Sequence, residues 1–180
     1  YIYSRGTASG KRVQALCGAK NHLVVMPDAD MAKVADALIG SAYGSAGERC
    51  MAISVAVPVG KETADRLVAT LKPRVEALKV AAYTDSTSDM GPVVSCQSLE
   101  RILGYIEGGV KQGATLVVDG RKVKVPGHEE GYFVGGCLFD NVTADMTIYK
   151  EEIFGPVLAV LRAESYEEAL QLVNDHEYGN

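Results

Sequence analysis

The sequence has 180 residues, enough for one domain or a little more, and a chain of this length can bury a substantial core. Its composition, 47% hydrophobic and 23% charged, is typical of a soluble globular protein, and a formal net charge of −5 argues against nucleic acid as the main partner, because phosphate binding needs clustered Lys and Arg. No apolar run approaches the ~20 residues that span a bilayer, and the first residues lack a signal-peptide pattern.

Short apolar runs of strand type alternate with helical patterns along the chain. Strands are expected at 23–26, 53–59, 78–82, 116–118, 132–138 and 157–161. Helices are expected around the apolar positions in 31–42, 64–71 and 99–110, and after residue 165. Strands separated by helices form βαβ units, so the pattern predicts an α/β fold with a mostly parallel sheet flanked by helices.

The first two helices carry local signals at their ends. Asp28 is expected to cap the first helix, with Asp30 in its positively polarised first turn. Pro73 is expected to end the second helix, because proline removes a backbone donor. The polar, turn-rich stretch from Tyr83 to Gly91 is the expected exposed loop.

Two serines mark where the later helices begin. Ser95 is expected to cap the third helix. Ser165 with Glu168 forms a capping box at the start of the last helix. Leu170 and Val173 are expected to give that last helix a buried face.

The four cysteines stand far apart in the sequence and form no C-x-x-C pair. Their spacing indicates neither a zinc site nor the disulfide framework of a small secreted domain, and with scattered histidines we expect no metal site. Reduced thiols are typical of the cytoplasm, or of the mitochondrial matrix if the source is eukaryotic.

The segment with the clearest chemical content is Gly44-Ser45-Ala46-Gly47-Glu48-Arg49-Cys50, between an expected helix and a buried strand. A thiol there lies on a loop held by rigid elements, a common place for a reactive group. Local context alone favours an ordinary buried cysteine, because most free cysteines act as small hydrophobes and reactivity needs a thiolate-stabilising environment.

Four segments, in order, resemble the aldehyde dehydrogenase superfamily. They are Gly18-Ala19-Lys20-Asn21 followed by Met26-Pro27-Asp28-Ala29-Asp30, Gly47-Glu48-Arg49-Cys50, Met90-Gly91-Pro92-Val93, and Lys150-Glu151-Glu152-Ile153-Phe154-Gly155-Pro156-Val157. The last matches the family's EEIFGPV motif closely, and the resemblance covers essentially the whole chain. It implies that residues 15–180 are the cysteine-bearing catalytic domain, truncated at its C-terminal end, and that residues 1–14 are the tail of a missing NAD-binding domain.

The resemblance also implies roles for individual residues. Cys50 would attack the aldehyde carbonyl as a thiolate, and its own backbone N–H would help hold the oxyanion. Hydride would pass to NAD and leave a thioacyl-enzyme. Glu152 would bind the nicotinamide ribose hydroxyls, and Phe154 would pack against the nicotinamide side of the cofactor. Without the motif, Glu152 would be interpreted as a surface carboxylate and Phe154 as a core ring.

Two departures from the usual family pattern narrow the function. Leu16 stands where most members have the Glu that activates water for thioester hydrolysis, and a coenzyme A thiolate would not need that base. Arg49 directly precedes Cys50 and suits a substrate carboxylate, as in a semialdehyde, although an ordinary structural Arg fits the spacing equally well. Together with 15–22 and 49–52, these residues resemble the CoA-acylating methylmalonate-semialdehyde dehydrogenases, which release propionyl-CoA or acetyl-CoA and CO2.

Two alternatives stay open. The first is a hydrolytic, NAD(P)-dependent aldehyde dehydrogenase that recruits another base, such as Glu48. The second is a non-catalytic isolated domain, because the chain has no Gly-rich phosphate turn, and Gly6–Gly10 lacks a preceding strand. The family's oxyanion-hole amide and a second carboxylate-binding Arg would lie upstream of Tyr1. We therefore expect these 180 residues alone to be inactive, and the whole protein to bind a small semialdehyde and no nucleic acid or membrane, as a homo-oligomer (dimer or tetramer).

Overall fold

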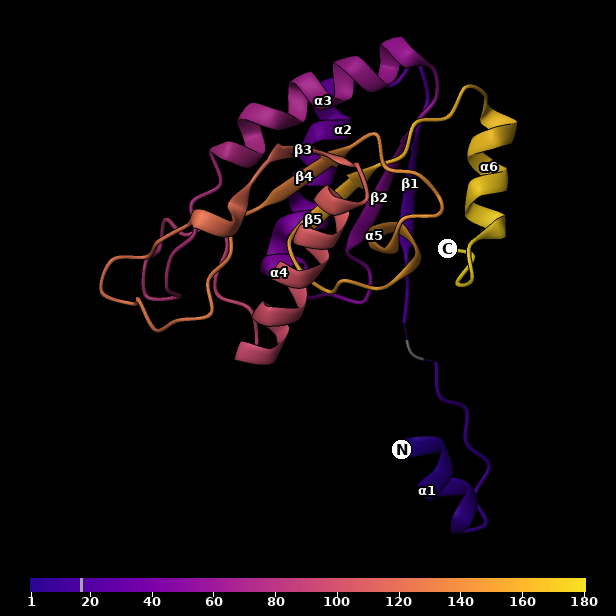
Figure 1. Cartoon of the computed structure of the whole chain (residues 1–180), viewed down its shortest axis with the longest axis vertical. Coiled ribbons are helices and arrows are strands. Elements are labelled where there is room, and N and C mark those ends of the chain that lie inside the picture. Colours follow the sequence, from indigo (N-terminus) through magenta and orange to yellow (C-terminus); the bar gives the residue numbers. More distant parts are fainter. Residues whose placement is uncertain (17) are drawn as a thin grey trace.

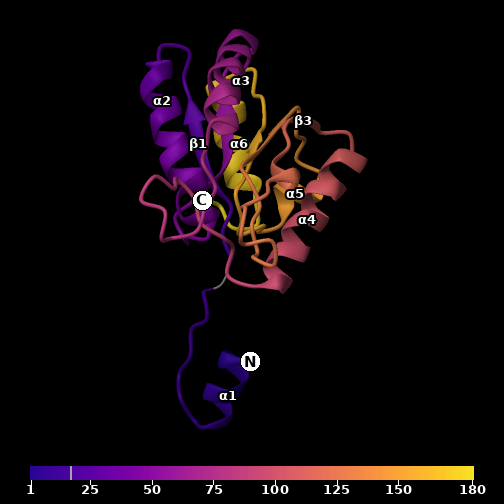
Figure 2. The same cartoon turned by 90° about the vertical axis from the view of Figure 1, so that its left-hand side faces the viewer.

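The apolar runs pair into a five-stranded sheet that lies between two layers of helices in the computed structural model (Figures 1 and 2). The structure describes residues 1–16 and 18–180, so Cys17, which belongs to the motif at 15–22, lies outside the described residues. The strands are β1 (Asn21–Val25), β2 (Ile53–Pro58), β3 (Thr115–Val118), β4 (Cys137–Asp140) and β5 (Val157–Val160). Their order across the sheet is β1-β2-β5-β4-β3, and only the β3–β4 pair is antiparallel. The predicted fold class is confirmed.

Helices cover both faces of this sheet. The α-helices of the described residues are α1 (Ile2–Ala8), which lies apart from the sheet, α2 (Met31–Leu38), α3 (Lys61–Glu76), α4 (Cys96–Lys111), α5 (Thr147–Lys150) and α6 (Tyr166–Asp175). The edge-on view shows α2 and α3 on one side of the sheet and α4 and α5 on the other (Figure 2). Shorter turns follow α2 and β3, namely a π-helical turn over Ile39–Tyr43 and 3-10 turns over Gly44–Gly47 and Gly120–Lys122.

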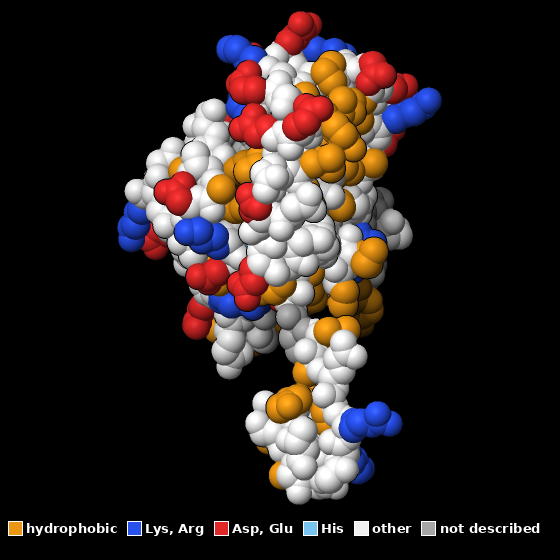
Figure 3. All heavy atoms as spheres, turned by 90° about the vertical axis from the view of Figure 1, so that its right-hand side faces the viewer, with side chains coloured by type: hydrophobic (Ala, Val, Ile, Leu, Met, Phe, Trp, Pro, Cys, Tyr) orange, Lys and Arg blue, Asp and Glu red, His pale blue; other side chains and the backbone are white. Residues whose placement is uncertain are grey.

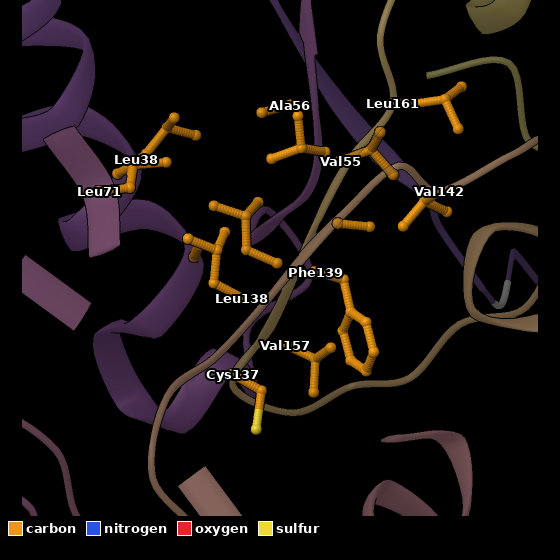
Figure 4. Close-up of a cluster of buried hydrophobic side chains, with 14 of the residues drawn as sticks. Leu38, Val55, Ala56, Leu71, Cys137, Leu138, Phe139, Val142, Val157 and Leu161 are labelled. Carbon is orange, nitrogen blue, oxygen red and sulfur yellow. The ribbon is translucent and has the colours of Figure 1, made fainter. Parts of the chain in front are cut away.

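The core forms where the helices meet the sheet (Figure 4). Leu38 of α2 and Leu71 of α3 lie on the same side as Leu138 of β4, and all three are fully buried. Phe139 is the next residue of β4, so it points to the other face, where it reaches Gly109 of α4. Each such side chain contributes roughly 1.5–3 kcal/mol by leaving water. Buried side chains therefore hold helices against both faces of the sheet.

Several element ends differ from the sequence expectation. Asp30, and not Asp28, caps α2, because its Oδ1 accepts from the backbone N–H groups of Ala32 (3.1 Å) and Lys33 (3.3 Å). Pro73 lies inside α3 and does not end it. The buried Leu71 and Val75 on either side of Pro73 hold the last turn against the core, which offsets the missing backbone hydrogen bond.

The two predicted serine caps are present. The Ser95 hydroxyl accepts from the N–H of Ser98 (3.1 Å), and that of Ser165 accepts from the N–H of Glu168 (3.1 Å). The capping box is only half formed, because the Glu168 carboxylate accepts from the N–H of Glu164 (2.7 Å) and not from that of Ser165. In α6 the buried residue is Ala169, whereas Leu170 is 39% exposed, so the predicted inward face was wrong at that position.

Two of the expected strands are shorter than the apolar runs suggest. The run at 78–82 forms only an isolated bridge between Val80 and Met90, and the run at 132–138 enters the sheet only from Cys137. The helix α1 was not expected at all. It has no buried residue and lies apart from the sheet, on an N-terminal arm (residues 1–16) where Tyr1, Ile2, Tyr3 and Leu16 are exposed (Figures 1 and 3).

Within residues 1–16 and 18–180, no helix has both the length and the hydrophobicity of a membrane span. The same residues contain no group of three or more His, Cys, Asp or Glu side chains placed to hold a metal ion.

Candidate functional site

A left-handed turn delivers Cys50 to the start of β2. Ser45 and Ala46 both have φ of 55°, and Gly47 follows with φ of 69°. Residues other than glycine seldom adopt this left-handed region, because it costs them roughly 1–2 kcal/mol each. Three such residues in a row turn the chain sharply after α2. Cys50 then lies exposed on the turn that precedes β2.

The Cys50 loop packs backbone to backbone against the loop before β5. A Cβ on Gly47 would lie 2.3 Å from the Gly155 carbonyl oxygen and 3.0 Å from that of Ala42. A Cβ on Gly155 would in turn lie 2.5 Å from Ile102 Cδ1 of α4. Only glycine allows this approach, and it fixes the two loops against each other.

These two loops form one pocket where β2 and β5 begin. It is lined by all four residues that the sequence singled out, Arg49, Cys50, Glu152 and Phe154, and also by Asn21. Phe154 adopts a left-handed φ of 54°, a strained conformation for an aromatic residue. Strain of this kind persists only where the surroundings fix the backbone, and it is common at functional sites. The sequence therefore identified residues that meet in space although they come from segments about 100 positions apart.

Lys20 supports the loop that carries Glu152, and sequence reasoning had given it no role. Its side chain is fully buried, and Nζ donates to the carbonyl oxygens of Ile148 (2.7 Å) and Glu151 (2.8 Å). Burial lowers the pKa of Lys20 to about 8, although the negative charges of Glu152 and Glu151 act to raise it. A lysine is rarely buried without such partners, so Lys20 is a fixed support for the pocket wall.

The pKa of Lys20 gives a test of this role by the pH dependence of stability. Because its folded pKa of about 8 is below the ordinary 10.5, the unfolded chain binds more protons between these values, and the contribution of Lys20 to stability rises as pH rises through that window. The free energy of unfolding of wild type minus that of Lys20→Met should therefore increase, by on the order of 3 kcal/mol, from pH 8 to 10.5. Urea unfolding across that range measures it. Lys33→Met, at an 84% exposed side chain, is the matched control. If the difference in free energy of unfolding between wild type and variant does not change with pH for either variant, Lys20 is not a buried ammonium group.

Arg49 has a partner within the chain. Its Nη2 donates to the carbonyl oxygen of Gly40, and the guanidinium lies so close to Gly44 that a Cβ there would meet Nη2 at 2.1 Å. The hydrogen bond ties the residue before Cys50 to the first part of the π-helical turn. The structure thus gives Arg49 a structural task, and its binding of a substrate carboxylate stays a prediction.

Glu48 is engaged away from the thiol. Its carboxylate accepts from the backbone N–H of Val94, at 3.0 Å through Oε2 and 3.3 Å through Oε1. The described lining of the Cys50 pocket does not include Glu48. A carboxylate held in this way is poorly placed to activate water at Cys50, which weakens the hydrolytic alternative.

Asn21 is the second pocket residue that sequence reasoning missed. Its Nδ2 donates to the carbonyl oxygens of Cys50 (2.9 Å) and Ala52 (2.8 Å), so it holds the turn that carries the thiol. The only signal in the sequence was its place beside Lys20 in the motif at 18–21.

Comparison with known proteins gives consistent matches over this chain. The family model described as "Aldehyde dehydrogenase family" matches residues 1–180. Malonate-semialdehyde dehydrogenase of Pseudomonas aeruginosa is 63% identical over 180 residues, which are 100% of this chain and 36% of that protein. The mitochondrial acylating methylmalonate-semialdehyde/malonate-semialdehyde dehydrogenase of Rattus norvegicus is 50% identical over 100% of this chain and 33% of its own length. The NAD+ complex structure of aldehyde dehydrogenase from Bacillus cereus superimposes with a TM-score of 0.89 at 33% identity, covering 98% of this chain and 35% of that one. The chain thus spans about a third of the length of these proteins.

Proposed function

The chain belongs to the aldehyde dehydrogenase family, and on that premise we propose that the whole protein oxidises malonate or methylmalonate semialdehyde with NAD and transfers the acyl group to coenzyme A. The observation that carries the proposal is the meeting of Cys50, Glu152 and Phe154 in one pocket. Similarity to the Pseudomonas and rat enzymes supports the choice of semialdehyde. Because the chain covers only 36% of the Pseudomonas protein, the activity is proposed for the whole protein and not for these 180 residues alone.

Cys50 is the proposed nucleophile. Its exposed thiolate would attack the aldehyde carbon, forming a C–S bond and an oxyanion toward which the Cys50 backbone N–H donates. The Asn21 amide fixes the carbonyl of the same residue, so the turn does not need to reorganise as charge develops. Loss of hydride from this adduct leaves a thioester on Cys50.

The pocket residues suit a dinucleotide. The Glu152 carboxylate, half-buried in the pocket wall, would accept hydrogen bonds from the nicotinamide ribose hydroxyls, and the Phe154 ring would supply an apolar face for the nicotinamide side. When bound, NAD supplies the hydride acceptor. Lys20 and the Gly47–Gly155 contact would hold Glu152 and Phe154 in place beside Cys50 in the pocket.

Leu16 favours coenzyme A over water as the acyl acceptor. A leucine cannot take a proton from water, and Glu48 is bound to Val94 N–H, so neither supplies the base that hydrolysis needs. A thiol acceptor needs less help, because its thiolate is already a strong nucleophile. Attack of that thiolate on the Cys50 thioester would release the Cys50 thiolate, and the acyl group's carboxylate would leave as CO2, with a proton taking its place on carbon, to yield acetyl-CoA or propionyl-CoA.

Coenzyme A dependence is the test of this function. NADH formation by the whole protein with malonate semialdehyde should require coenzyme A, and Leu16→Glu, with Leu16→Gln as its control, should raise the rate without coenzyme A by restoring a base. Absorbance at 340 nm with and without coenzyme A measures both. Fast turnover of wild type in its absence would favour the hydrolytic alternative. NADH formation by the 180-residue chain alone would contradict its proposed inactivity.

Partners and compartment are part of the same proposal. We propose a homo-oligomer, a dimer or tetramer, that takes a small-molecule substrate. The cytoplasm, or the mitochondrial matrix in a eukaryote, is supported by the name of the rat relative, which is mitochondrial, and by the unpaired state of Cys50, Cys96 and Cys137.

A further inference from the structure

We infer that Asn180 is a positioning residue for Cys50 and acts on it through Asn21. The inference rests on the proposed function of Cys50 as a nucleophile. After α6, the chain returns to β1, and Asn180 lies beside Lys20, Asn21 and His22 at the start of that strand. Asn21 and Asn180 are 159 positions apart in the sequence, and their side-chain amides are hydrogen-bonded to each other.

The backbone groups at the two ends of this series of hydrogen bonds determine which way each side-chain amide is turned. The backbone N–H of Lys20 can only donate, and it donates to Asn180 Oδ1 (3.2 Å). Asn180 Nδ2 must therefore face Asn21, where it donates to Oδ1. Asn21 is then left with Nδ2 toward the carbonyl oxygens of Cys50 and Ala52, which can only accept. Asn180 thus sets the orientation of the amide that holds the Cys50 turn.

The segment that carries Asn180 is itself held in place. His176 is buried, and its Nε2 lies 3.1 Å from the carbonyl oxygen of Tyr149, while its Nδ1 accepts from the N–H of Tyr178 (3.2 Å). Tyr178 lies over Gly18 so closely that a Cβ there would be 2.6 Å from its hydroxyl oxygen. The backbone N–H of His22 donates to the Asn180 carbonyl oxygen (3.2 Å). These contacts hold the segment that carries the Asn180 amide against β1 and the residues before it.

The Asn21 amide supplies the hydrogen bonds that connect the Cys50 turn to the neighbouring strand. Cys50 and Met51 are exposed, and within the turn the N–H of Ala52 donates to the Arg49 carbonyl oxygen (3.0 Å). The two bonds from Asn21 tie both ends of the Cys50–Ala52 stretch to β1, the strand beside β2. Loss of the orienting contact from Asn180 should free the Asn21 amide to rotate, and the turn should then open more often.

Hydrogen exchange, which does not depend on catalysis, tests the inference. In the whole protein, exchange of peptides covering 48–54 should accelerate about five-fold in Asn180→Ala, the effect of one net hydrogen bond, and by at least as much in Asn21→Ala, which removes both hydrogen bonds to the turn. Asn180→Asp keeps the size of the side chain and the acceptor for Lys20 N–H but removes the donor to Asn21, so it should accelerate exchange similarly even if the Ala variant unfolds. Asn174→Ala, on the exposed side of α6, is the matched control and should exchange as wild type does.

Kinetics gives the second readout. If Asn180 acts through Asn21, the double variant Asn21→Ala/Asn180→Ala should lose no more kcat than Asn21→Ala alone, with KM for NAD unchanged in all three. If the losses of kcat in the two single variants multiply in the double variant, the inference is overturned. Unchanged exchange at 48–54 in both Asn180 variants would overturn it as well. If wild type forms no NADH, the proposed function fails, and the exchange experiment still decides whether Asn180 holds the turn.

Discussion

Replacement of Cys50 by Ala is expected to lower the rate of NADH formation by the whole protein by at least roughly a thousand-fold, because no covalent adduct can form without the thiol. The loss should appear in kcat and not in stability, since Cys50 is exposed and its removal leaves no cavity in the core. Thermal unfolding of the variant should match that of wild type. Stopped-flow absorbance, with NAD and semialdehyde in excess, measures the first turnover directly.

The control for this experiment is another exposed thiol. Cys96 lies at the start of α4, where its Sγ donates to Glu100 Oε1 (3.4 Å), and it does not line the pocket. Cys96→Ala should therefore keep the wild-type rate. Mass spectrometry should distinguish the two thiols directly. After incubation with substrate and NAD, a thioacyl adduct should be detected only on the peptide that contains Cys50. An active Cys50→Ala enzyme, or an adduct on Cys96, would remove Cys50 as the nucleophile.

Gly47→Ala is expected to lower the free energy of unfolding by about 3 kcal/mol or more. The φ of 69° costs an L-residue roughly 1–2 kcal/mol, and the new Cβ would meet the Gly155 carbonyl oxygen at 2.3 Å. Neither backbone can yield easily, because Gly155 is itself confined by Ile102. The variant should also lose activity, since separation of the two loops moves Glu152 and Phe154 away from Cys50.

Gly104 provides the matched substitution. It lies in α4, and a Cβ there would have no heavy atom within 4 Å. Gly104→Ala should be neutral or stabilising by up to about 1 kcal/mol, through helix propensity alone. Urea unfolding of both variants gives the comparison. If Gly47→Ala unfolds at the same urea concentration as Gly104→Ala, the close approach of the two loops is not a constraint on the fold.

The sequence predicted those features of the fold that are encoded locally. Alternating apolar runs are enough to indicate a mostly parallel sheet, and Ser95 and Ser165 cap helices because a side-chain oxygen meets an N–H three residues later. The errors occurred where several local signals compete or where packing overrides them. Two aspartates precede α2, and only geometry decides that Asp30 is the cap; Pro73 is tolerated because its neighbours are buried.

In the candidate site, too, some residues could be predicted from the sequence and others could not. Cys50, Glu152 and Phe154 were found because they lie in short motifs that resemble a known family. Lys20 and Asn180 were missed, because what they do depends on contacts made 131 positions away, at Glu151, and 159 positions away, at Asn21. No periodicity or spacing rule reports contacts of that range.

The place of β5 in the sheet determines when the pocket can exist during synthesis. The ribosome makes the turn that carries Cys50 before β5, which lies between β2 and β4 and follows about 100 residues later. Until β5 pairs with β2, at Val55–Ala159 and Ala56–Val160, the nascent turn has no Gly155 to rest against, and the left-handed conformation at residues 45–47 has no support. Cys50 is therefore an ordinary thiol until β5 is made, and it gains its surroundings when β5 inserts between β2 and β4.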